Sequence, residues 1–423
     1  MLFISSRNKN LKYSLSDCIK LGLAKDGGLF IPEYFPKINL NDFNVKMKIP
    51  DFAAMVLNGF FENDILQNKL SEICDQAFSF PIPLNRINES TFILDLCKGP
   101  TLSFKDFGAR FLAECLSRIN NKNKVTIMVA TSGDTGSAVA SAFYKKENIN
   151  VIILYPKGKV SKKQEQQLAC WDSNILSFAV NGTFDDCQKL VKDAFQDEWW
   201  QNEMHISSAN SINIGRLLPQ IVYYAYSSYQ FFSLYNKKPN YIIPTGNLGN
   251  ATAAFWAREM GFPINEISLS TNENKVICDY LSSGTYLPQK SILTLANAMD
   301  VGNPSNFERL SHLFPAYELF KKNIMAISVD NIKISQTIQE VYNKYNYIIC
   351  PHTATSFYVK NKLNLDPSIV VSTADPCKFD DIIEPIILDK VPISEELKKL
   401  LNKKLSFINI EPNLTELKNN INK

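Results

Sequence analysis

Histidine, the commonest side-chain metal ligand in proteins, is scarce in this chain. Among its 423 residues there are 3 histidines. These are His205, His312 and His352, which lie far apart in the sequence. Protein zinc sites draw mainly on histidines and cysteines at close spacing. The sequence therefore predicts no metal site.

Cysteine pairing motifs are absent as well. The 9 cysteines are scattered, without a Cys-x-x-Cys pair. This usage is typical of buried free thiols in a reducing compartment. The N-terminus, MLFISSRNKN, lacks the apolar core of a signal peptide. No apolar run approaches the ~18 residues that would indicate a membrane span. We therefore expect a cytoplasmic protein with no membrane partner.

Neither sign of charge is in marked excess. The chain has 45 lysines and arginines against 42 aspartates and glutamates, which gives a net charge of +3. No basic block stands out, so the charge pattern does not favour nucleic acid as a partner. A hydrophobic content of 45% is typical of an ordinary globular protein. The length favours two domains with a further module, and it leaves open whether the protein is a monomer or a homodimer.

Short apolar runs alternate with longer helical stretches along the chain. Continuous β-branched runs predict strands that are covered on both faces, as in parallel sheets. The predicted strands are VTIMVAT (125–131), VIILYP (151–156), ILSFAV (175–180), YIIPTG (241–246), YIIC (347–350) and SIVVSTA (368–374). Helices are predicted at 136–146, 217–235 and 249–261, the second of them buried because it is apolar nearly all round. This alternation predicts an α/β fold.

The N-terminal part shows a different pattern. SLSDCIKLGLAKDGG is predicted to be a capped helix that begins at Ser14 or Ser16 and ends at Gly27-Gly28. Further helices are predicted in FAAMVLNGFF (52–61) and DILQNKLSEICDQAF (64–78). We therefore expect a mostly helical N-terminal segment that is laid against an α/β body.

Two glycine-bearing loops each follow a predicted strand and open a predicted helix. They are TSGDTGS (131–137) and PTGNLGN (244–250). Free backbone N–H groups at a helix N-terminus can hold an anion, and small residues let the anion approach the main chain. Neither loop matches G-x-G-x-x-G or G-x-x-x-x-G-K-[ST], which disfavours dinucleotides and nucleoside triphosphates. Either loop, taken alone, could also be only a tight turn.

One lysine has unusual neighbours. In GPTLSFKDFG (99–108), Lys105 is flanked by Phe104 and Phe107. Apolar surroundings favour the uncharged amine, which can form a Schiff base. A phosphate-binding loop elsewhere would suit a phosphorylated aldehyde, and pyridoxal 5'-phosphate is the cofactor that needs both. The alternative is a lysine at a helix start that directs its charge to solvent.

These motifs resemble those of the threonine synthase family. GPTLSFKDFGARF is similar to that family's lysine motif, and ATSGDTGSAV is similar to the loop that follows it. The resemblance covers nearly the whole chain in the family's order. The other similar segments are GLAKDGGLFIP (22–32), NSINIGRLLPQIVYY (210–224), PTGNLGNATA (244–253), AMDVGNPSNFER (298–309), PHTATS (351–356) and STADPCKF (372–379).

The resemblance implies a two-domain pyridoxal phosphate fold of type II, like that of the tryptophan synthase β subunit, with the cofactor between two α/β domains. It implies a mostly helical N-terminal segment (1–95), a larger cofactor-binding domain (96–124 and 213–423) and a smaller mobile domain (125–212). It also implies a lyase of amino-acid biosynthesis that converts O-phospho-L-homoserine and water to L-threonine and phosphate.

Cofactor roles are implied residue by residue. Lys105 would hold the cofactor as an internal aldimine and shuttle protons. Thr373 would offer its hydroxyl to the pyridine nitrogen, and Asp134 would lie near the ring hydroxyl, where relatives often have asparagine. The cofactor phosphate would be surrounded by the N–H groups of Gly246, Asn247, Leu248, Gly249 and Asn250.

Substrate roles follow from the same resemblance. Thr131, Ser132 and Thr135 would bind the substrate carboxylate. Asn210 and Arg216 would hold the substrate phosphate, a task that suits the planar guanidinium fork of arginine. Because the site must exclude stray water, we expect the smaller domain to close over the substrate.

The chain departs from the family pattern at a few positions. Lys98 and Asp375 stand where histidine is usual, which could be a local exchange of charges, and Arg7 is not followed by glycine. Two other functions stay open at this point. One is another enzyme of the same fold type, such as a serine or threonine dehydratase or an O-acetylserine sulfhydrylase. The other is a non-catalytic relative that only binds a ligand.

Overall fold

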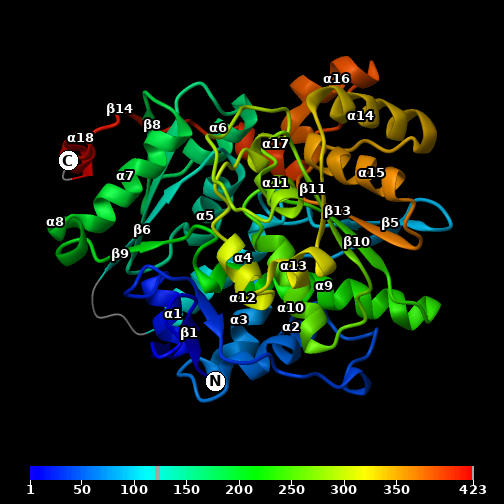
Figure 1. Cartoon of the computed structure of the whole chain (residues 1–423). Helices are drawn as coiled ribbons and strands as arrows, with labels where there is room; N and C mark the ends of the chain where they lie inside the picture. The colour runs from blue at the N-terminus through cyan, green and yellow to red at the C-terminus, as the bar shows by residue number, and fades with distance from the viewer. Residues whose placement is uncertain (120–123, 422–423) are drawn as a thin grey trace.

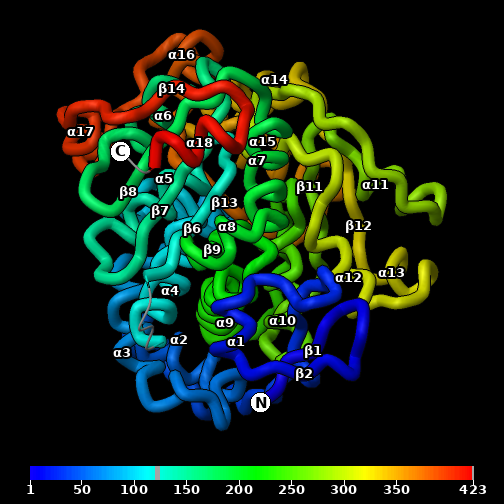
Figure 2. Tube along the Cα trace, turned by 90° about the vertical axis from the view of Figure 1, so that its left-hand side faces the viewer, coloured from blue at the N-terminus to red at the C-terminus, as the bar shows by residue number. Residues whose placement is uncertain are grey.

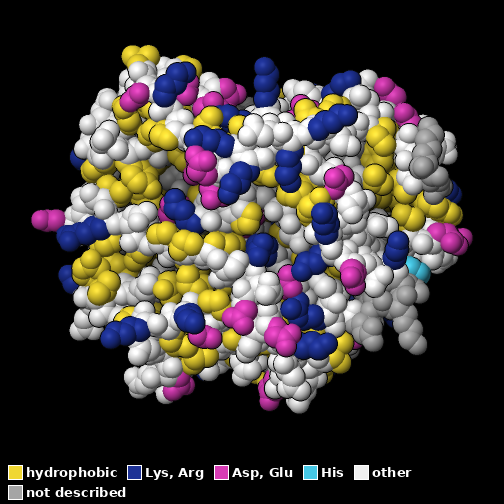
Figure 3. Space-filling model, turned by 180° about the vertical axis from the view of Figure 1, so that it is seen from behind, with side chains coloured by type: hydrophobic (Ala, Val, Ile, Leu, Met, Phe, Trp, Pro, Cys, Tyr) yellow, Lys and Arg dark blue, Asp and Glu magenta, His cyan; other side chains and the backbone are white. Residues whose placement is uncertain are grey.

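Two large sheets and one small sheet organise the computed structural model of the chain, which describes residues 1–119 and 124–421 (Figure 1). The N-terminal segment forms the base of the molecule, below both large sheets (Figure 2). Within the described residues, no helix combines the length and the apolar character needed to cross a bilayer. On the face shown in Figure 3, basic and acidic side chains are interspersed. All nine cysteines are free thiols, and all but the half-buried Cys278 are buried.

The N-terminal segment contains the expected helices together with a small sheet that was not expected. Its strands are antiparallel, in the order β2-β1-β3. They are β1 (Phe3–Ser5), β2 (Lys12–Tyr13) and β3 (Phe30–Pro32). The helices and 3-10 turns are α1 (Leu15–Leu21), η1 (Leu40–Asp42), α2 (Ile49–Leu57), η2 (Asn58–Phe61), η3 (Gln67–Lys69) and α3 (Leu70–Ala77). The predicted end of the first helix at Gly27-Gly28 is wrong, because Gly22, with φ 72°, closes α1 after about two turns.

The larger of the two main sheets has six strands in the order β12-β11-β10-β13-β5-β4. They are β4 (Leu84–Arg86), β5 (Thr91–Asp95), β10 (Asn240–Pro244), β11 (Ile267–Thr271), β12 (Met325–Ser328) and β13 (Ser368–Ser372). All neighbours are parallel except β4 and β5. Alternate residues of the central strands belong to different cores: Ile242 packs in one and Ile243 in another. The sheet is therefore covered on both faces, as continuous apolar strands require.

The second main sheet has five parallel strands in the order β14-β8-β7-β6-β9. They are β6 (Val125–Ala130), β7 (Ile149–Pro156), β8 (Ile175–Val180), β9 (Ile206–Ser208) and β14 (Ile408–Ile410). Helices α5 (Asp134–Phe143), α6 (Lys162–Ala169), α7 (Phe184–Gln196), α8 (Glu198–Asn202) and α18 (Leu414–Ile421) surround it. Residues Met128 and Val129 again lie in different cores, so this sheet is also buried on both faces.

The remaining helices enclose the six-stranded sheet. On one side α14 (Asn331–Tyr345), α15 (Pro351–Leu363) and α16 (Asp380–Ile387) form a layer (Figure 1). The other elements are α4 (Lys105–Arg118), α9 (Ile214–Tyr235), α10 (Gly249–Met260), α11 (Val276–Ser283), η4 (Asn297–Met299), α12 (Phe307–Leu313), α13 (Tyr317–Asn323), η5 (Pro376–Phe379) and α17 (Glu395–Leu401). Helix α9 is buried over most of its length, as its apolar surface predicted.

Five of the six predicted strands are present as β6, β7, β8, β10 and β13. The predicted strand at 347–350 is wrong. This segment is extended, with Ile349 and Cys350 buried, but it pairs with no strand of the described residues and leads directly into α15 at Pro351. A buried apolar run becomes a strand only where a neighbouring strand has free hydrogen-bonding groups.

Sheet membership crosses two of the domain limits expected from the sequence. β4 and β5 fall within 1–95, yet they are strands of the six-stranded sheet, and β14 falls within 213–423, yet it pairs with β8. Residues 120–123, which precede the expected start of the smaller domain, lie outside the described residues. We propose that the larger domain begins at β4 and that the smaller domain takes up the C-terminal β14 and α18.

Candidate functional site

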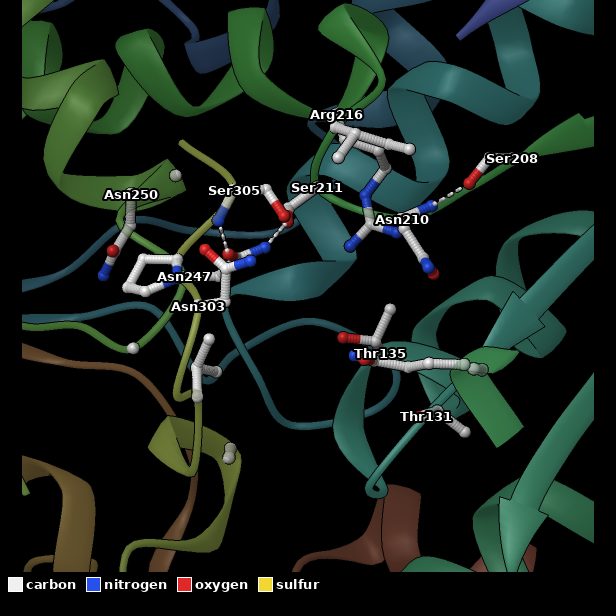
Figure 4. A pocket seen from close by; sticks show the side chains of 18 of the residues that line it. Thr131, Thr135, Ser208, Asn210, Ser211, Arg216, Asn247, Asn250, Asn303 and Ser305 are labelled. Atoms are coloured by element: carbon white, nitrogen blue, oxygen red, sulfur yellow. Dashed lines mark hydrogen bonds between the residues drawn. The ribbon is translucent and has the colours of Figure 1, made fainter. Parts of the chain in front are cut away.

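A cavity of about 940 Å³ lies between the two main sheets, at the carboxyl ends of β6, β10 and β13 (Figure 4). Ligands of open α/β sheets bind at these ends. Every residue with a role implied by resemblance lines this cavity except Leu248. The lining members are Lys105, Thr131, Ser132, Asp134, Thr135, Asn210, Arg216, Gly246, Asn247, Gly249, Asn250 and Thr373.

Lys105 is the first residue of α4, and its side chain faces the cavity. Its Nζ lies 4.6 Å from the centroid of the Phe104 ring. Phe107 does not contribute the expected apolar surroundings, because a residue two positions along a helix points to another side. Its ring packs instead against Phe80 and Tyr223, at centroid distances of 4.7 and 5.2 Å. The apolar contact of Lys105 therefore comes from Phe104.

The loop before Lys105 is held by Asp106. Its carboxylate accepts the Thr101 N–H at 2.9 Å and the Thr101 hydroxyl at 2.7 Å. A Cβ at Gly99 would lie 2.4 Å from Asp106 Oδ2, so only glycine leaves room for this carboxylate. The Phe104 N–H donates to the Thr373 carbonyl at 3.0 Å, which ties the start of α4 to the chain after β13. Lys105 and Thr373 are thus positioned by the same backbone contact.

The charge state of Lys105 depends on burial and on three charged neighbours. Burial lowers the pKa of Lys105 to about 8. Asp134 opposes this change, whereas Lys378 and Arg216 lower the pKa further. An amine with a pKa near 8 has a substantial uncharged fraction at neutral pH, and the uncharged form is the nucleophile that a Schiff base requires.

Asp134 forms a buried ion pair with a lysine that the sequence did not indicate as a site residue. Lys378 Nζ lies 2.6 Å from Asp134 Oδ1, and both side chains are almost completely shielded from solvent. Gln164 Nε2 donates to the same carboxylate at 3.2 Å. Burial opposes the charge on Asp134, but Lys378 and Lys105 outweigh it and hold the pKa of this carboxyl well below its usual range.

The glycine loop after β10 brings the main chain up to the cavity. A Cβ at Gly246 would lie 2.7 Å from the Met299 Cα, so the loop is closed against 298–301. Leu248 adopts the left-handed conformation, with φ 60°, at the N-cap of α10. Its side chain is buried away from the cavity, so only its N–H group could serve a ligand. The loop thus has the free helix N-terminus that an anion prefers.

Asparagine side chains stabilise this loop. Asn250 accepts the Thr245 hydroxyl at 2.7 Å and donates to the Pro244 carbonyl at 2.9 Å. Asn247 donates to the Ser211 hydroxyl and accepts the Ser305 N–H (Figure 4). The two asparagines therefore shape the loop. The side chain of Asn247 also joins the loop to the segment that contains the expected substrate residue Asn210.

Arg216 reaches into the cavity from the first turn of α9, beside Asn210 and across from Thr135 (Figure 4). It is 4% exposed and donates through Nη1 to the Ala209 carbonyl. Its Nε and the Oδ1 of Asn210 are buried without a partner among the described residues. Burial lowers the pKa of Arg216 to about 10, which leaves it charged at neutral pH. Unpartnered polar atoms that face a cavity indicate a ligand.

The loop after β6 offers hydroxyl groups at the N-terminus of α5. Thr131 Oγ1 accepts the N–H groups of Gly133 and Gly136, at 3.0 and 2.9 Å. Its hydroxyl therefore has only its own proton to offer a ligand, and its first task is to shape the loop. Ser132 and Thr135 are half-buried and line the cavity, so they are better placed for direct contact.

His352 also lines the cavity, although the sequence indicated only the motif that contains it and gave this residue no role. It is 2% exposed, and its Nε2 accepts the Ala298 N–H at 3.1 Å. Burial lowers its pKa to about 4, so the ring is neutral and carries its proton on Nδ1. That Nδ1 has no partner among the described residues. A buried histidine beside Asp134 and Lys105 is not evident from sequence because its contacts come from distant segments.

The suggested exchange of charges between Lys98 and Asp375 is supported in part: burial lowers the pKa of Lys98, but the charges of Asp95 and Asp375 outweigh it and raise the pKa. Lys98 pairs with Asp95, at 2.9 Å, at the end of β5. Asp375 instead caps η5, where its side chain accepts the Cys377 N–H at 2.9 Å. Each residue has a local hydrogen-bonding partner, and the Asp375 charge acts on Lys98 in addition.

Comparisons with known proteins agree on one family. Residues 81–373 match the pyridoxal-phosphate dependent enzymes, and residues 2–78 match the threonine synthase N terminus. The chain is 38% identical over 428 residues to the threonine synthase of Buchnera aphidicola subsp. Acyrthosiphon pisum, with 99% of each chain covered. It is 37% identical over 402 residues to that of Escherichia coli, with 94% of each covered. The chain belongs to the threonine synthase family.

Solved structures of threonine synthases have the same fold. The crystal structure from Escherichia coli has a TM-score of 0.92 at 35% identity, with 100% of this chain and 99% of that chain covered. The pyridoxal phosphate-bound threonine synthase from Brucella melitensis has a TM-score of 0.93 at 28% identity, with 100% and 98% covered. A threonine deaminase from Solanum lycopersicum is 14% identical with a TM-score of 0.53, a likeness of fold alone. The chain is thus a pyridoxal-phosphate dependent lyase of the threonine synthase family.

Proposed function

We propose that the chain converts O-phospho-L-homoserine and water to L-threonine and phosphate, with pyridoxal phosphate as cofactor. The observation that supports this most strongly is the meeting, in one cavity, of an amine with a lowered pKa and two separate anion-binding elements. Lys105 supplies the amine. The loop at 246–250 supplies one anion site, and Arg216 with Asn210 supplies the other. Two such elements suit a phosphorylated cofactor and a phosphorylated substrate that are bound at the same time.

The residues present fit pyridoxal phosphate. The closely packed loop around Gly246 can receive the phosphate on its N–H groups, and Lys105 can bond the aldehyde carbon. Thr373 can offer a hydroxyl to the pyridine nitrogen, and a hydroxyl partner favours a neutral ring. When bound, the cofactor supplies an electron sink that makes the C–H protons beside the substrate amine acidic.

Lys105 is the residue to which we assign proton transfer. Its Nζ can take the proton from the substrate α-carbon, because a pKa near 8 allows both charge states at neutral pH. The β-proton and the phosphate on the γ-carbon would leave afterwards, a proton would be added at the γ-carbon and water at the β-carbon, and return of a proton to the α-carbon would give threonine. The neighbouring Phe104 ring lowers the polarity at Nζ and helps to exclude water from this position.

Arg216 and Asn210 are assigned to the substrate phosphate. The unpartnered Nε of Arg216, together with the rest of its guanidinium, can bind phosphate oxygens in a bidentate manner. The Asn210 amide can present its NH₂ group to the same phosphate. Ser132 and Thr135, at the N-terminus of α5, are assigned to the substrate carboxylate, where the helix dipole also favours an anion. Thr131 supports them by shaping the loop.

Closure of the smaller domain over the substrate completes the proposal. The carboxylate-binding loop belongs to the five-stranded sheet, whereas Lys105 and the phosphate loop belong to the part built on the six-stranded sheet. A substrate that contacts both domains favours the closed arrangement, in which the two domains lie close together. Closure would also keep water away from the reacting carbons until the β-carbon is electrophilic.

The alternatives left open by the sequence are less well supported. A dehydratase or a sulfhydrylase acts on substrates without a phosphate and has no need of Arg216 and Asn210 as a second anion site. A non-catalytic relative has no need of a lysine with a lowered pKa at the cavity wall. The free thiols and near-neutral net charge are compatible with a small-molecule enzyme of the cytoplasm, where we propose that it works.

The decisive experiment combines borohydride reduction with an activity assay. Reduction of the enzyme loaded with pyridoxal phosphate, followed by peptide mapping, should give an adduct on Lys105. Lys105→Ala should lose the visible cofactor absorbance. Its turnover should fall by roughly 10³-fold or more, because a group that both bonds the cofactor and transfers protons is removed. An adduct on a different lysine would refute the assignment.

A matched variant separates substrate binding from cofactor binding. Arg216→Ala should keep the cofactor absorbance but lower kcat/KM for O-phospho-L-homoserine roughly 100-fold, because a charge-assisted bidentate contact contributes about 3 kcal/mol. Arg216→Lys is the control that keeps the charge but not the fork, and it should recover only part of the loss. Unchanged kinetics in Arg216→Ala would show that the substrate phosphate binds elsewhere. Serine and threonine as test substrates distinguish a dehydratase.

A further inference from the structure

Lys378 and Asp134 join the two domains through a buried ion pair at the cavity wall. Asp134 starts α5, beside the five-stranded sheet, and Lys378 lies in η5, immediately after β13 of the six-stranded sheet. Their side chains are 2% and 0% exposed, and the N–O distance is 2.6 Å. Lys378 also donates to the Thr101 carbonyl at 3.0 Å, in the loop that leads to Lys105. One ammonium group thus contacts both domains and the lysine loop.

A second, more peripheral contact joins η5 and the start of α16 to the neighbouring helix α6. Lys163, on α6, pairs with Asp380 at 2.7 Å and donates to the Cys377 carbonyl at 2.9 Å. The Ser161 hydroxyl donates to the Lys378 carbonyl at 3.3 Å. Lys163 does not line the cavity. Two ion pairs therefore join this region to the helices of the five-stranded sheet: one reaches Asp134 of α5, which lines the cavity, and the other holds Lys163 of α6, away from the cavity.

Several charged or titratable groups face Lys105 from the elements packed around it. Asp134 comes from α5, Lys378 from η5 and Arg216 from α9. Cys350 and His352 come from the start of α15, and His352 is neutral there. On its own helix, Asp106 is engaged by Thr101. Among the carboxylates, Asp134 is the one whose charge acts on the pKa of Lys105.

We propose that Lys378 is a positioning residue for the reaction, which holds Asp134 as a neutralised carboxylate beside Lys105 when the smaller domain is docked. This inference rests on the proposed function, because it concerns the amine that binds the cofactor. An unpaired carboxylate at this place would attract the Lys105 cation and keep the proton on its nitrogen. Paired with Lys378, the same carboxylate is largely neutralised.

The pairing also explains how a charged aspartate, and not a neutral side chain, can be buried at this position. A buried carboxylate needs a positive partner, which a neutral amide would not, and Lys378 is that partner. Gln164 donates a further hydrogen bond to the same carboxylate. Because the two charges are on different domains, undocking separates them. The charge on Lys105 then depends on whether the cavity is closed, which links proton transfer to the exclusion of water.

The test uses the enzyme loaded with pyridoxal phosphate and follows the pH midpoint of its visible absorbance, which reports the proton on the Lys105 adduct. Lys378→Met should raise this midpoint by about one pH unit or more, because a cation is removed and the carboxylate is freed. Asp134→Asn should lower it, because the nearest anion is lost. If the residues act as a pair, Lys378→Met should change the midpoint less in the Asp134→Asn background than in the unaltered enzyme.

Two controls make the outcome specific. Lys378→Arg keeps the charge and should restore a midpoint close to that of the unaltered enzyme. Lys163→Met breaks the peripheral ion pair of the same interface and should leave the midpoint where it is. An equal rise in Lys163→Met, or none in Lys378→Met, overturns the inference. If Lys378→Met does not fold, a midpoint that fails to fall in Asp134→Asn overturns it instead.

The same measurements distinguish failure of the proposed function from failure of the role assigned to Lys378. If the unaltered enzyme takes up no pyridoxal phosphate, or is reduced by borohydride at another residue, the proposed function itself fails. If it is reduced at Lys105 with normal turnover and the variants leave the midpoint unchanged, only the role of Lys378 fails.

Discussion

The two glycines of the GPTLSFKDFG motif are required by side chains that approach them. Gly99 gives room to Asp106, which fixes the loop before Lys105. Gly108 lies on α4 where this helix meets α9, and a Cβ there would be 2.7 Å from the Arg216 carbonyl and 2.9 Å from its Nε. The motif that carries the reactive amine therefore also fits against the arginine assigned to the substrate phosphate.

This close approach predicts the effect of Gly108→Ala. Alanine favours the helix itself by about 1 kcal/mol, but the added methyl group would press on the backbone and Nε of Arg216. Overpacking of this kind costs about 1–3 kcal/mol, so we expect a lower free energy of unfolding in urea and a higher KM for O-phospho-L-homoserine. Gly158→Ala is the control for KM alone, because no atom lies within 4 Å of that position, although its φ of +69° means that alanine there also lowers the stability. It should leave KM unchanged, and equal KM values in both variants would contradict the prediction.

Helix α9 is the element that places Arg216, and its start is held by Arg309 of α12. The Arg309 guanidinium donates to the carbonyls of Ile212 and Phe30, at 2.7 and 3.0 Å, and to Asn306 Oδ1 at 2.6 Å. Asn306 in turn donates to the Asn247 carbonyl at 3.0 Å. One buried arginine therefore joins the N-terminal sheet, the start of α9 and the glycine loop.

Loss of this arginine should affect several elements together. Arg309→Met would leave three buried acceptors without a partner, at about 1–3 kcal/mol each. We expect a large loss of stability in thermal melting and a weaker affinity for pyridoxal phosphate. Arg258→Met is a suitable control, since the half-buried Arg258 makes one 3.3 Å hydrogen bond to Asn323 and a contact with the Phe255 ring. It should cost roughly 1 kcal/mol and leave cofactor affinity intact. If Arg258→Met lost more stability and more cofactor affinity than Arg309→Met, Arg309 would not be the residue that holds these elements together.

At the scale of the whole molecule, the cavity is formed jointly by the two sheet systems and the N-terminal segment. Its wall includes Arg7 and Leu29 from the base, Thr135 from the smaller domain and Thr373 from the larger one. A ligand in this position contacts parts that are far apart in the sequence. Binding should therefore stabilise the assembly of domains and not only one of them.

Cofactor binding should accordingly raise the melting temperature of the whole chain. At a concentration of 100 times Kd, the expected stabilisation is about 2.7 kcal/mol, and calorimetry with and without pyridoxal phosphate measures it. Pyridoxal, which lacks the phosphate, should stabilise less if the 246–250 loop binds the phosphate. Lys105→Ala should reduce the effect of pyridoxal phosphate without abolishing it, since the loop remains. Equal effects of pyridoxal and pyridoxal phosphate would rule out the loop as the phosphate site.

The sequence alone determined the parallel strands and the chemistry-bearing loops. Longer apolar runs such as 151–156 favour strands covered on both faces, and Lys105, Arg216 and the glycine loop stand in motifs whose residues are neighbours along the chain. Periodicity and motifs are properties of a short stretch of sequence, so both can be recognised before the fold is known.

Only the tertiary structure decided which distant residues meet. The partner of Asp134 is 244 positions away in Lys378 (378 minus 134), His352 lines the same cavity with a Nδ1 that has no partner among the described residues, and 347–350 pairs with no strand of those residues. The physical reason is that ion pairing, burial and strand pairing depend on the surroundings in space. Those surroundings are made by segments that the local sequence does not contain.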